Sequence, residues 1–320
     1  MLRFVVGPAD LAATRFAVSP VFELAMLLRA LAGSSPARSL DRRFGAAFAA
    51  LRQDPAVRAF LFLHGPGYGA SFAAPPPAGL GQTIDDDLVV LRGAEQAAVA
   101  EGVREVLRRR RPEPVVAALL GSDDLPDRLA DGIRRAWDGV LAADWPRVRA
   151  VLERDVRFRA ERLAQGGWSA ALPGMHEGLA WRDGGIDIAS SAEGEEDLGG
   201  RGLLLVPSVF LAPQRLAVTD DAPWQPTVVY PCRGAGLLLD EAPAPADPLA
   251  PLLGRTRAGL LLALAAPSST TQLAALTGAS VGATGDHLRV LLDAGLVERS
   301  RLARSVVYRR TPLGDALVAG

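Results

Sequence analysis

One stretch of sequence decides the fold of the C-terminal quarter of the chain: TTQLAALTGASVGATGDHLRVLLDAGLV, residues 270–297. Gly278 can adopt the left-handed conformation that ends a helix, and Ser280 is a preferred N-cap for a helix that follows. Gly295 then closes this second helix. The apolar residues recur at helical spacing and should pack into one core: Leu273, Leu276, Leu288, Leu291 and Leu292. The stretch therefore predicts two helices joined by a tight turn.

The sequence on both sides of this stretch extends the pattern. Residues 249–264 predict a leading helix, residues 297–301 and 305–309 predict a β-hairpin, and residues 312–318 predict a short final helix. The hairpin region carries five arginines and no acid within twelve residues: Arg299, Arg301, Arg304, Arg309 and Arg310. An exposed hairpin with five like charges repels itself, so we expect phosphate groups to neutralise it.

The order of these elements is typical of a winged helix-turn-helix, in which the helix after the turn enters the major groove of duplex DNA. Charge supports this interpretation, because residues 246–320 hold eight arginines and five acids, a net charge of +3, whereas the whole chain has a net charge of −1. The expected DNA-contacting residues are Thr271, Ser280, Gly282, Thr284, Asp286, His287, Arg289, Arg299, Arg301, Arg304 and Arg309.

Two of these residues have alternative roles. His287 could donate a hydrogen bond to a phosphate, or it could help to pack the turn. Asp286 would repel phosphate, although a carboxylate can accept a hydrogen bond from cytosine N4. Gly285 weakens the helix that carries them, and Ala303 stands where a glycine is usual at the tip of a wing.

Four short motifs stand at matching places in these elements: Leu253-Gly254-Arg255-Thr256-Arg257, His287-Leu288 with Leu291, Ala294-Gly295-Leu296-Val297, and Arg304-Ser305-Val306-Val307-Tyr308. Together they resemble the ArsR-type winged-helix regulators. The resemblance implies a homodimer that binds an imperfect palindrome in double-stranded DNA and represses transcription until an effector lowers its affinity. Metal sensors of that family carry paired cysteines on the second helix, where this chain has Gln272-Leu273-Ala274-Ala275, so metal sensing is not implied.

The chain before residue 240 predicts a helix-rich domain with a small, mostly antiparallel sheet. Helical patterns run to about residue 170, and Ser19-Pro20 is a strong start signal for one of the helices. From about residue 178 the apolar period changes to two. The strand candidates are 179–181 and 186–188, which should form a hairpin, and 203–206, 209–211, 216–218, 227–230 and 237–239.

A proline-rich stretch divides the chain. Residues 241–248 predict a stiff linker between an N-terminal α+β domain, residues 1–240, and the winged helix-turn-helix, residues 249–320. The fold class is therefore α+β, and we expect the N-terminal domain to mediate dimerisation and to sense an effector. Residues 10–17, 202–210 and 223–231 resemble a domain without established activity that precedes such winged helices in GC-rich bacteria.

Other candidate sites in the first 240 residues carry weaker signals. Phe210, Trp224 and Tyr230 could line a pocket for a small-molecule effector, or they could form an aromatic core. Cys232, the only cysteine, excludes an intramolecular disulfide; beside Arg233 it could sense redox state or be inert. None of the three histidines stands at metal-ligand spacing, so we expect no metal, no cofactor and no catalytic residue.

Targeting signals are also weak. Gly7-Pro8 interrupts the N-terminal apolar run, so no export signal is expected, and the longest apolar run, residues 258–266, is far below the ~20 residues that span a bilayer. We therefore expect a cytoplasmic protein without membrane contact.

Three hypotheses for function follow. The first is a one-component transcription regulator, of the repressor type that the resemblance implies. The second is an N-terminal enzyme whose winged helix serves as a structural or protein-interaction module. The third is a degenerate regulator that binds DNA weakly and acts through a partner protein, motivated by Gly285, Asp286 and Ala303.

Overall fold

The structure of the protein is a computed structural model. It describes residues 1–33, 38–65, 68–189, 193–220, 224–236, 249–264, 267–277, 279–302 and 305–319. The chain forms two compact units, an N-terminal unit of Met1–Ala143 with Gly166–Cys232 and a C-terminal unit of Asp144–Gln165 with Arg233–Gly320. The sequence predicted a single domain boundary near residue 240. The two units are divided differently, because the long helix α10, Trp145–Gly166, belongs with the C-terminal unit. The predicted linker lies outside the described residues.

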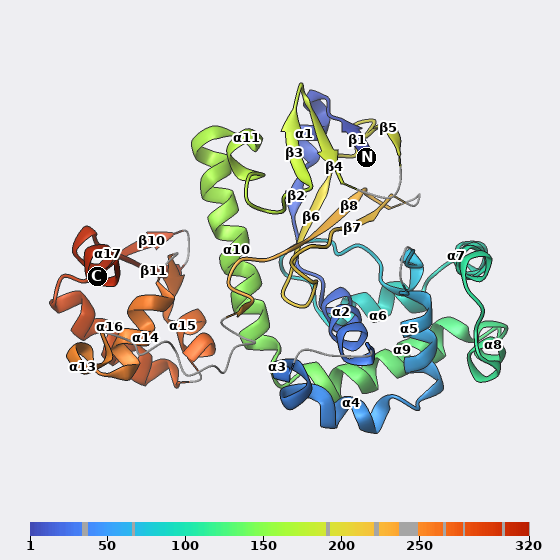
Figure 1. The fold of residues 1–320 in the computed structure, drawn as a ribbon, viewed down its shortest axis with the longest axis horizontal. Helices are drawn as coiled ribbons and strands as arrows, with labels where there is room; N and C mark the ends of the chain where they lie inside the picture. Colours follow the sequence, from blue (N-terminus) through green and yellow to red (C-terminus); the bar gives the residue numbers. More distant parts are fainter. Residues whose placement is uncertain are drawn as a thin grey trace. The chain divides into compact units, whose positions relative to one another are not determined.

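Two four-stranded sheets stand among the described residues of the N-terminal unit (Figure 1). One has the order β3-β4-β1-β5, with bounds Leu179–Arg182, Gly185–Ile188, Leu2–Val5 and Gly194–Asp197. The other has the order β2-β6-β8-β7, with bounds Arg15–Phe16, Leu204–Ser208, Thr227–Pro231 and Ala217–Thr219. Each contains parallel and antiparallel pairs. The α+β class is confirmed, but the expectation of one mostly antiparallel sheet was wrong in this detail.

The reason for this difference lies in β1 and β2. Both come from the first sixteen residues, which the sequence assigned to the helical part, and they contain only four and two residues. Segments this short carry too little alternation to be recognised. The predicted hairpin of β3 and β4 is confirmed; its turn residues Asp183 and Gly184 both have positive φ, as a two-residue type I′ turn requires.

Most of the remaining chain of the N-terminal unit is helical. The α-helices are α1 Pro8–Ala13, α2 Pro20–Ala32, α3 Arg38–Leu40, α4 Ala46–Leu51, α5 Pro55–Leu63, α6 Ile84–Arg92, α7 Gln96–Arg109, α8 Pro114–Leu120, α9 Leu125–Ala136 and α11 Trp168–Ala171. Single turns of other helix types occur at Asp41–Gly45, Ser71–Ala73 and Trp137–Leu141. The predicted start of α2 is confirmed, because the Ser19 hydroxyl accepts a hydrogen bond from the Phe22 N–H at 3.2 Å.

Buried carboxylates connect these helices to distant backbone. Asp10 accepts a hydrogen bond from the Gly202 N–H at 3.0 Å, and Glu23 accepts one from the Val209 N–H at 3.0 Å. Asp87 accepts one from the first turn of α2. The predicted strand at 209–211 does not form, because the Val209 N–H is bound by Glu23 and the Leu211 N–H by the Ser208 hydroxyl, so the chain bends.

The C-terminal unit contains the predicted helix-turn-helix and hairpin. Its elements after α10 are α13 Ala250–Leu253, α14 Arg255–Ala263, β9 Ser268–Ser269, α15 Thr270–Thr277, α16 Val281–Asp293, β10 Val297–Leu302, β11 Ser305–Arg310 and α17 Pro312–Ala319. The strands form one sheet in the order β10-β11-β9. The leading helix is broken at Gly254, which has a φ of +79°. Three helices beside a sheet that ends in a β10–β11 hairpin form a winged helix-turn-helix (Figure 1).

One leucine-rich core holds this unit together. Leu273, Leu288 and Leu291 are buried in it as predicted, together with Leu260 and Leu261 of α14. Leu292 is half-buried and packs against this core, whereas Leu276, also predicted to pack there, is half-buried and not part of it. α10 is joined to the same unit by polar contacts, in which Gln272 donates a hydrogen bond to Glu153 at 3.1 Å and Arg157 donates one to the carbonyl of Pro267.

The buried Glu23 generates a prediction about pH. Burial raises its pKa to about 7, against the smaller opposing effect of hydrogen bonds from Ser208, Val209 and Phe210. Between pH values of about 4.5 and about 7, Glu23 keeps its proton in the folded state and releases it in the unfolded state. The free energy of unfolding therefore falls as the pH rises through this window. Glu23→Gln removes this titration. We therefore expect the melting temperature of the variant minus that of the natural protein to be larger at pH 8 than at pH 5.

Thermal unfolding followed by circular dichroism at both pH values measures this difference. Glu177→Gln, which changes an exposed carboxylate of the same unit, is the control and should show no such trend. A Glu23→Gln difference that is the same at pH 5 and pH 8 contradicts the prediction.

The packing of α17 on the hairpin generates a second prediction. A Cβ atom at Gly314 would lie 2.1 Å from the carbonyl oxygen of Leu296, so Gly314→Ala must displace α17. We expect a loss of about 1–3 kcal/mol in the free energy of unfolding of the C-terminal unit, measured by urea denaturation. Gly259→Ala is the matched control, because a Cβ there meets open space in a helix interior, and it should stabilise by about 0.5–1 kcal/mol. Equal effects of the two substitutions are incompatible with the close contact.

Candidate nucleic-acid interface

The helix after the turn, α16, begins as the sequence predicts. The Ser280 hydroxyl accepts a hydrogen bond from the Ala283 N–H at 3.2 Å, which caps the first turn. Leu288 and Leu291 face the core, and the opposite side is exposed. In helix-turn-helix domains the N-terminal residues of this helix contact base edges, so the exposed residues of its first two turns are the candidates for such contacts.

Thr284 is a correction to the predicted interface. Its exposed fraction is 0 %, and its hydroxyl donates a hydrogen bond to the Ser280 carbonyl at 2.9 Å. The spacing explains the error, since Thr284 lies four residues before Leu288 and seven before Leu291 and so shares the buried face. Thr284 therefore cannot contact DNA while α16 packs in this way.

The exposed face of α16 carries both signs of charge. It consists of residues at helical spacing: Gly282, Asp286, Arg289 and Asp293, all exposed. Its net charge is −1, so this face by itself does not attract phosphate. His287 is half-buried at the border of the face, which leaves both of its predicted roles open. Affinity for a nucleic acid would have to come from elsewhere in the unit.

The hairpin supplies exposed cations. In the β10–β11 register Arg299 lies opposite Tyr308 and Arg301 lies opposite Val306, so both arginines are on the same face of the hairpin. Both side chains are exposed, and within the described part of the chain neither has an ion-pair partner. Two unpaired guanidinium groups on one face are suited to contacts with successive phosphates.

Two other arginines of the hairpin are neutralised by acids. Arg309 forms an ion pair with Glu298 at 2.7 Å, and Arg310 forms one with Asp315 at 2.8 Å. Arg309 is also on the opposite face from Arg299. The expectation of five mutually repelling charges was wrong for these two, because it counted acids only between residues 299 and 310 and so left out Glu298 and Asp315 on either side. Arg304 and Ala303 lie outside the described residues.

The N-terminus of α15 contributes one predicted contact. Thr271 is exposed at its first turn. Its neighbour Gln272 is held on both sides, because its amide oxygen accepts a hydrogen bond from the Ser269 N–H at 3.0 Å and its amide nitrogen donates to Glu153 of α10. These contacts fix α15 and leave Thr271 at the surface.

The structure separates the three aromatic residues predicted to line an effector pocket. Phe210 borders a cavity of the N-terminal unit. Tyr230 does not, because its exposed fraction is 0 % and it packs in the core between the sheets. Trp224 is half-buried and does not border the cavity either. The sequence missed Arg29, His176 and Arg215, which do border it, since these residues are far apart in the chain and only the fold brings them together.

Cys232 and His64, one of the three histidines, both lie in the core. Cys232 is buried. His64 is buried, and its Nδ1 lies 3.0 Å from the Phe60 carbonyl oxygen; burial lowers its pKa to about 4.

The described residues contain no group of three His, Cys, Asp or Glu side chains arranged to hold a metal ion. None of the described helices combines the length and the apolar character that crossing a membrane requires.

Comparisons with known proteins give two family matches. Residues 252–300 match the model of a helix-turn-helix domain, which covers α14, α15, α16 and the start of the hairpin. Residues 126–236 match a family of unknown function, DUF5937. No curated protein and no solved structure was found to be similar. The C-terminal part is thus a helix-turn-helix domain, and this indicates a DNA-binding regulator of transcription.

The unequal pairing of the hairpin arginines generates a third prediction. The double variant Arg299→Ala, Arg301→Ala should weaken binding to duplex DNA of any sequence and reduce the slope of log affinity against log salt by ~1.8, about 0.9 per lost phosphate contact. Fluorescence anisotropy with a labelled duplex at several salt concentrations measures both effects. Arg309→Ala, from the same hairpin, should change the slope by less. If the slope changes equally in the double variant and in Arg309→Ala, or does not change in the double variant, Arg299 and Arg301 are not the main phosphate contacts of the hairpin.

Proposed function

We propose that the protein is a one-component repressor of the ArsR type, which binds an imperfect palindrome in double-stranded DNA as a homodimer. The observation that carries this proposal is the combination of a capped, exposed α16 with two unpaired arginines on one face of the adjoining hairpin. In this arrangement α16 provides contacts to base edges, whereas Arg299 and Arg301 provide affinity for the phosphates on either side of the groove.

A homodimer is supported by exposed leucines in the C-terminal unit. Leu252 of α13 has an exposed fraction of 69 % and Leu313 of α17 one of 59 %, and Leu262 of α14 is also exposed. A second copy of the chain that covers these side chains would remove apolar surface from water, which favours association. A two-fold dimer would place two α16 helices about 34 Å apart, one turn of duplex.

We propose no catalytic activity. Two carboxyl groups with a raised pKa, Glu23 and Asp87, each about 7 because of burial, accept hydrogen bonds from backbone N–H groups in the core. A third carboxyl group with a raised pKa, Glu196, lies on the edge strand β5, and a hydrogen bond to Asp220 raises its pKa to about 7. Glu23 and Asp87 thus have structural roles, and Asp220 beside Glu196 forms an ion pair with Arg201.

A second candidate function is supported by the acids of α16. Asp286 and Asp293 outnumber Arg289 on its exposed face, so this face could instead bind a basic segment of a partner protein. The winged helix would then act through the partner and bind DNA weakly. The two candidates make opposite predictions for sequence preference on DNA.

The test is selection of duplexes by the full-length protein from a random DNA library, followed by gel shifts. We expect enrichment of one palindromic motif, and at least ~1,000-fold tighter binding to it than to a scrambled duplex at physiological salt. Asp293→Asn, at the far end of α16, should leave the preference unchanged, whereas Arg289→Ala should relax it. Absence of an enriched motif contradicts the repressor and favours the partner-protein function. In cells, a reporter behind the motif should be repressed by the natural protein and not by Arg289→Ala.

A further inference from the structure

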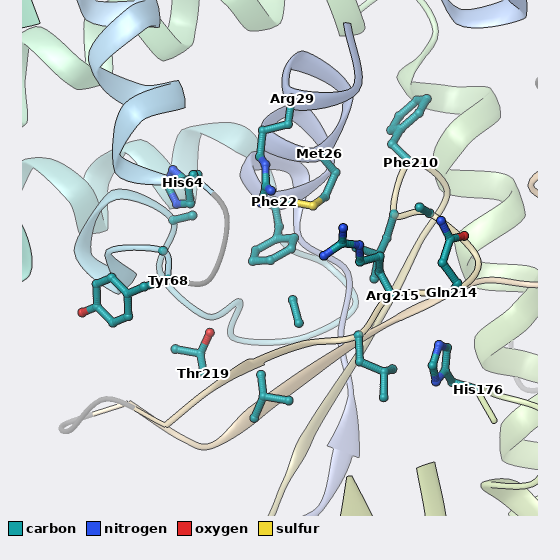
Figure 2. A pocket seen from close by; sticks show the side chains of 18 of the residues that line it. Phe22, Met26, Arg29, His64, Tyr68, His176, Phe210, Gln214, Arg215 and Thr219 are labelled. Carbon is teal, nitrogen blue, oxygen red and sulfur yellow. The ribbon is translucent and has the colours of Figure 1, made fainter. Parts of the chain in front are cut away.

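A cavity of about 740 Å³ lies within the N-terminal unit, between α2, the segment after α5 and the residues around β7 (Figure 2). The volume falls in the range of sites that enclose small molecules. One face of α2 forms part of its wall, because Phe22, Met26, Arg29 and Ala30 recur at helical spacing along it. The cavity belongs to a single unit, so its shape does not depend on the C-terminal unit.

Apolar side chains form much of this wall. Phe22 and Met26 come from α2, Phe210 follows β6, and Leu216 and Val218 come from the region of β7. Such a wall favours the apolar body of a ligand, because contact with it removes apolar surface from water.

Two arginines of the wall lie close together. Figure 2 shows Arg29 of α2 and Arg215, which precedes β7, extending into the cavity from neighbouring sides. Burial lowers the pKa of Arg29, and the charge of Arg215 lowers it further. Within the described part of the chain, no carboxylate lies within ion-pair distance of either guanidinium group. Two like charges at an apolar cavity repel one another, and an anion between them would remove this repulsion.

The acids that border the cavity do not cancel these charges. Asp220 accepts a hydrogen bond from Arg201 through Oδ1 at 3.2 Å and is not within ion-pair distance of Arg29 or Arg215; its Oδ2 is buried and has no hydrogen-bond partner among the described residues. Glu177 is exposed to solvent. The side of the cavity with Arg29 and Arg215 therefore remains positive.

A third polar group of the wall lacks a partner. The Nδ1 atom of His176 accepts a hydrogen bond from the Gly178 N–H at 2.9 Å, so in the neutral ring the proton is on Nε2. Nε2 is buried, and among the described residues it has no hydrogen-bond partner. A buried donor without an acceptor is costly, and a ligand oxygen would satisfy it.

We propose that this cavity binds a small organic carboxylate with an apolar body, held by Arg29 and Arg215 and oriented by the Nε2–H of His176. The carboxylate accepts hydrogen bonds from the two guanidinium groups, and the apolar body lies against Phe22, Met26 and Phe210. Such a ligand would be the effector of the regulator; that role rests on the proposed function, whereas binding itself does not.

The experiment is calorimetric titration of the full-length protein, without DNA, with naphthalene-2-carboxylate, 4-phenylbutanoate and octanoate. Each is compared with its neutral carboxamide, which has the same body and lacks the charge. We expect at least one carboxylate to bind with a Kd at least about tenfold lower than its amide, because charge-assisted hydrogen bonds replace neutral ones. Absence of DNA makes the result independent of whether the protein is a repressor.

Variants locate the site. Arg29→Met with Arg215→Met should raise the Kd of the carboxylate to that of the amide, and the exposed Arg215→Met alone should raise it at least about threefold. Arg128→Met, an exposed arginine of α9, is the matched control and should leave both values unchanged. Ala212→Trp, which fills part of the cavity, should weaken the carboxylate and the amide together.

Three results would overturn the proposal. The first is that none of the three carboxylates binds more tightly than its amide. The second is that carboxylate binding is equally strong in Arg215→Met and Arg128→Met. The third is that Ala212→Trp, with an unchanged circular dichroism spectrum, binds the carboxylate as the natural protein does, which would place the ligand elsewhere.

Discussion

The burial of one leucine stripe on α16 is the constraint on which the candidate DNA interface depends. Leu288 and Leu291 lie in the core with Leu260 and Leu273, and this fixes the rotation of the helix about its axis. Because side chains that share a helix face are three or four residues apart, the same packing buries Thr284 and exposes Asp286 and Arg289. The chemistry that α16 offers to a partner is thus set by its apolar side.

Ion pairing decides which of the hairpin's cations remain available. Glu298 lies directly opposite Arg309 in the β10–β11 register, and Asp315 reaches Arg310 from the first turn of α17. Exposed pairs of this kind contribute little to stability, but they neutralise charge locally. The effect is to concentrate the free positive charge on the face with Arg299 and Arg301. Contacts to phosphates fix the register and orientation of a protein on duplex DNA, and among the described residues these two arginines are the hairpin cations available for them.

Buried carboxylates hold distant backbone segments of the N-terminal unit together. Asp10, Glu23 and Asp87 each bind backbone N–H groups from a different part of the chain. Since a buried carboxylate without such donors would be very costly, these contacts set the position of α2 relative to β6. The cavity between them follows from this framework, because α2 provides Arg29 and the chain beyond β6 provides Phe210.

The sequence by itself determined the local structure of the C-terminal unit. Apolar spacing, the cap at Ser280 and the alternation in the hairpin are local signals, and the helices and strands that they predict are present. In the N-terminal unit the same signals found α2 and the β3–β4 hairpin but missed β1 and β2, whose pairing partners are more than 170 residues away. Only the tertiary structure decided which charged groups are paired, that Tyr230 is core, and that Arg29, His176 and Arg215 border one cavity. The physical reason is that charge pairing and burial depend on distances between segments, and a sequence pattern reports only the neighbours along the chain.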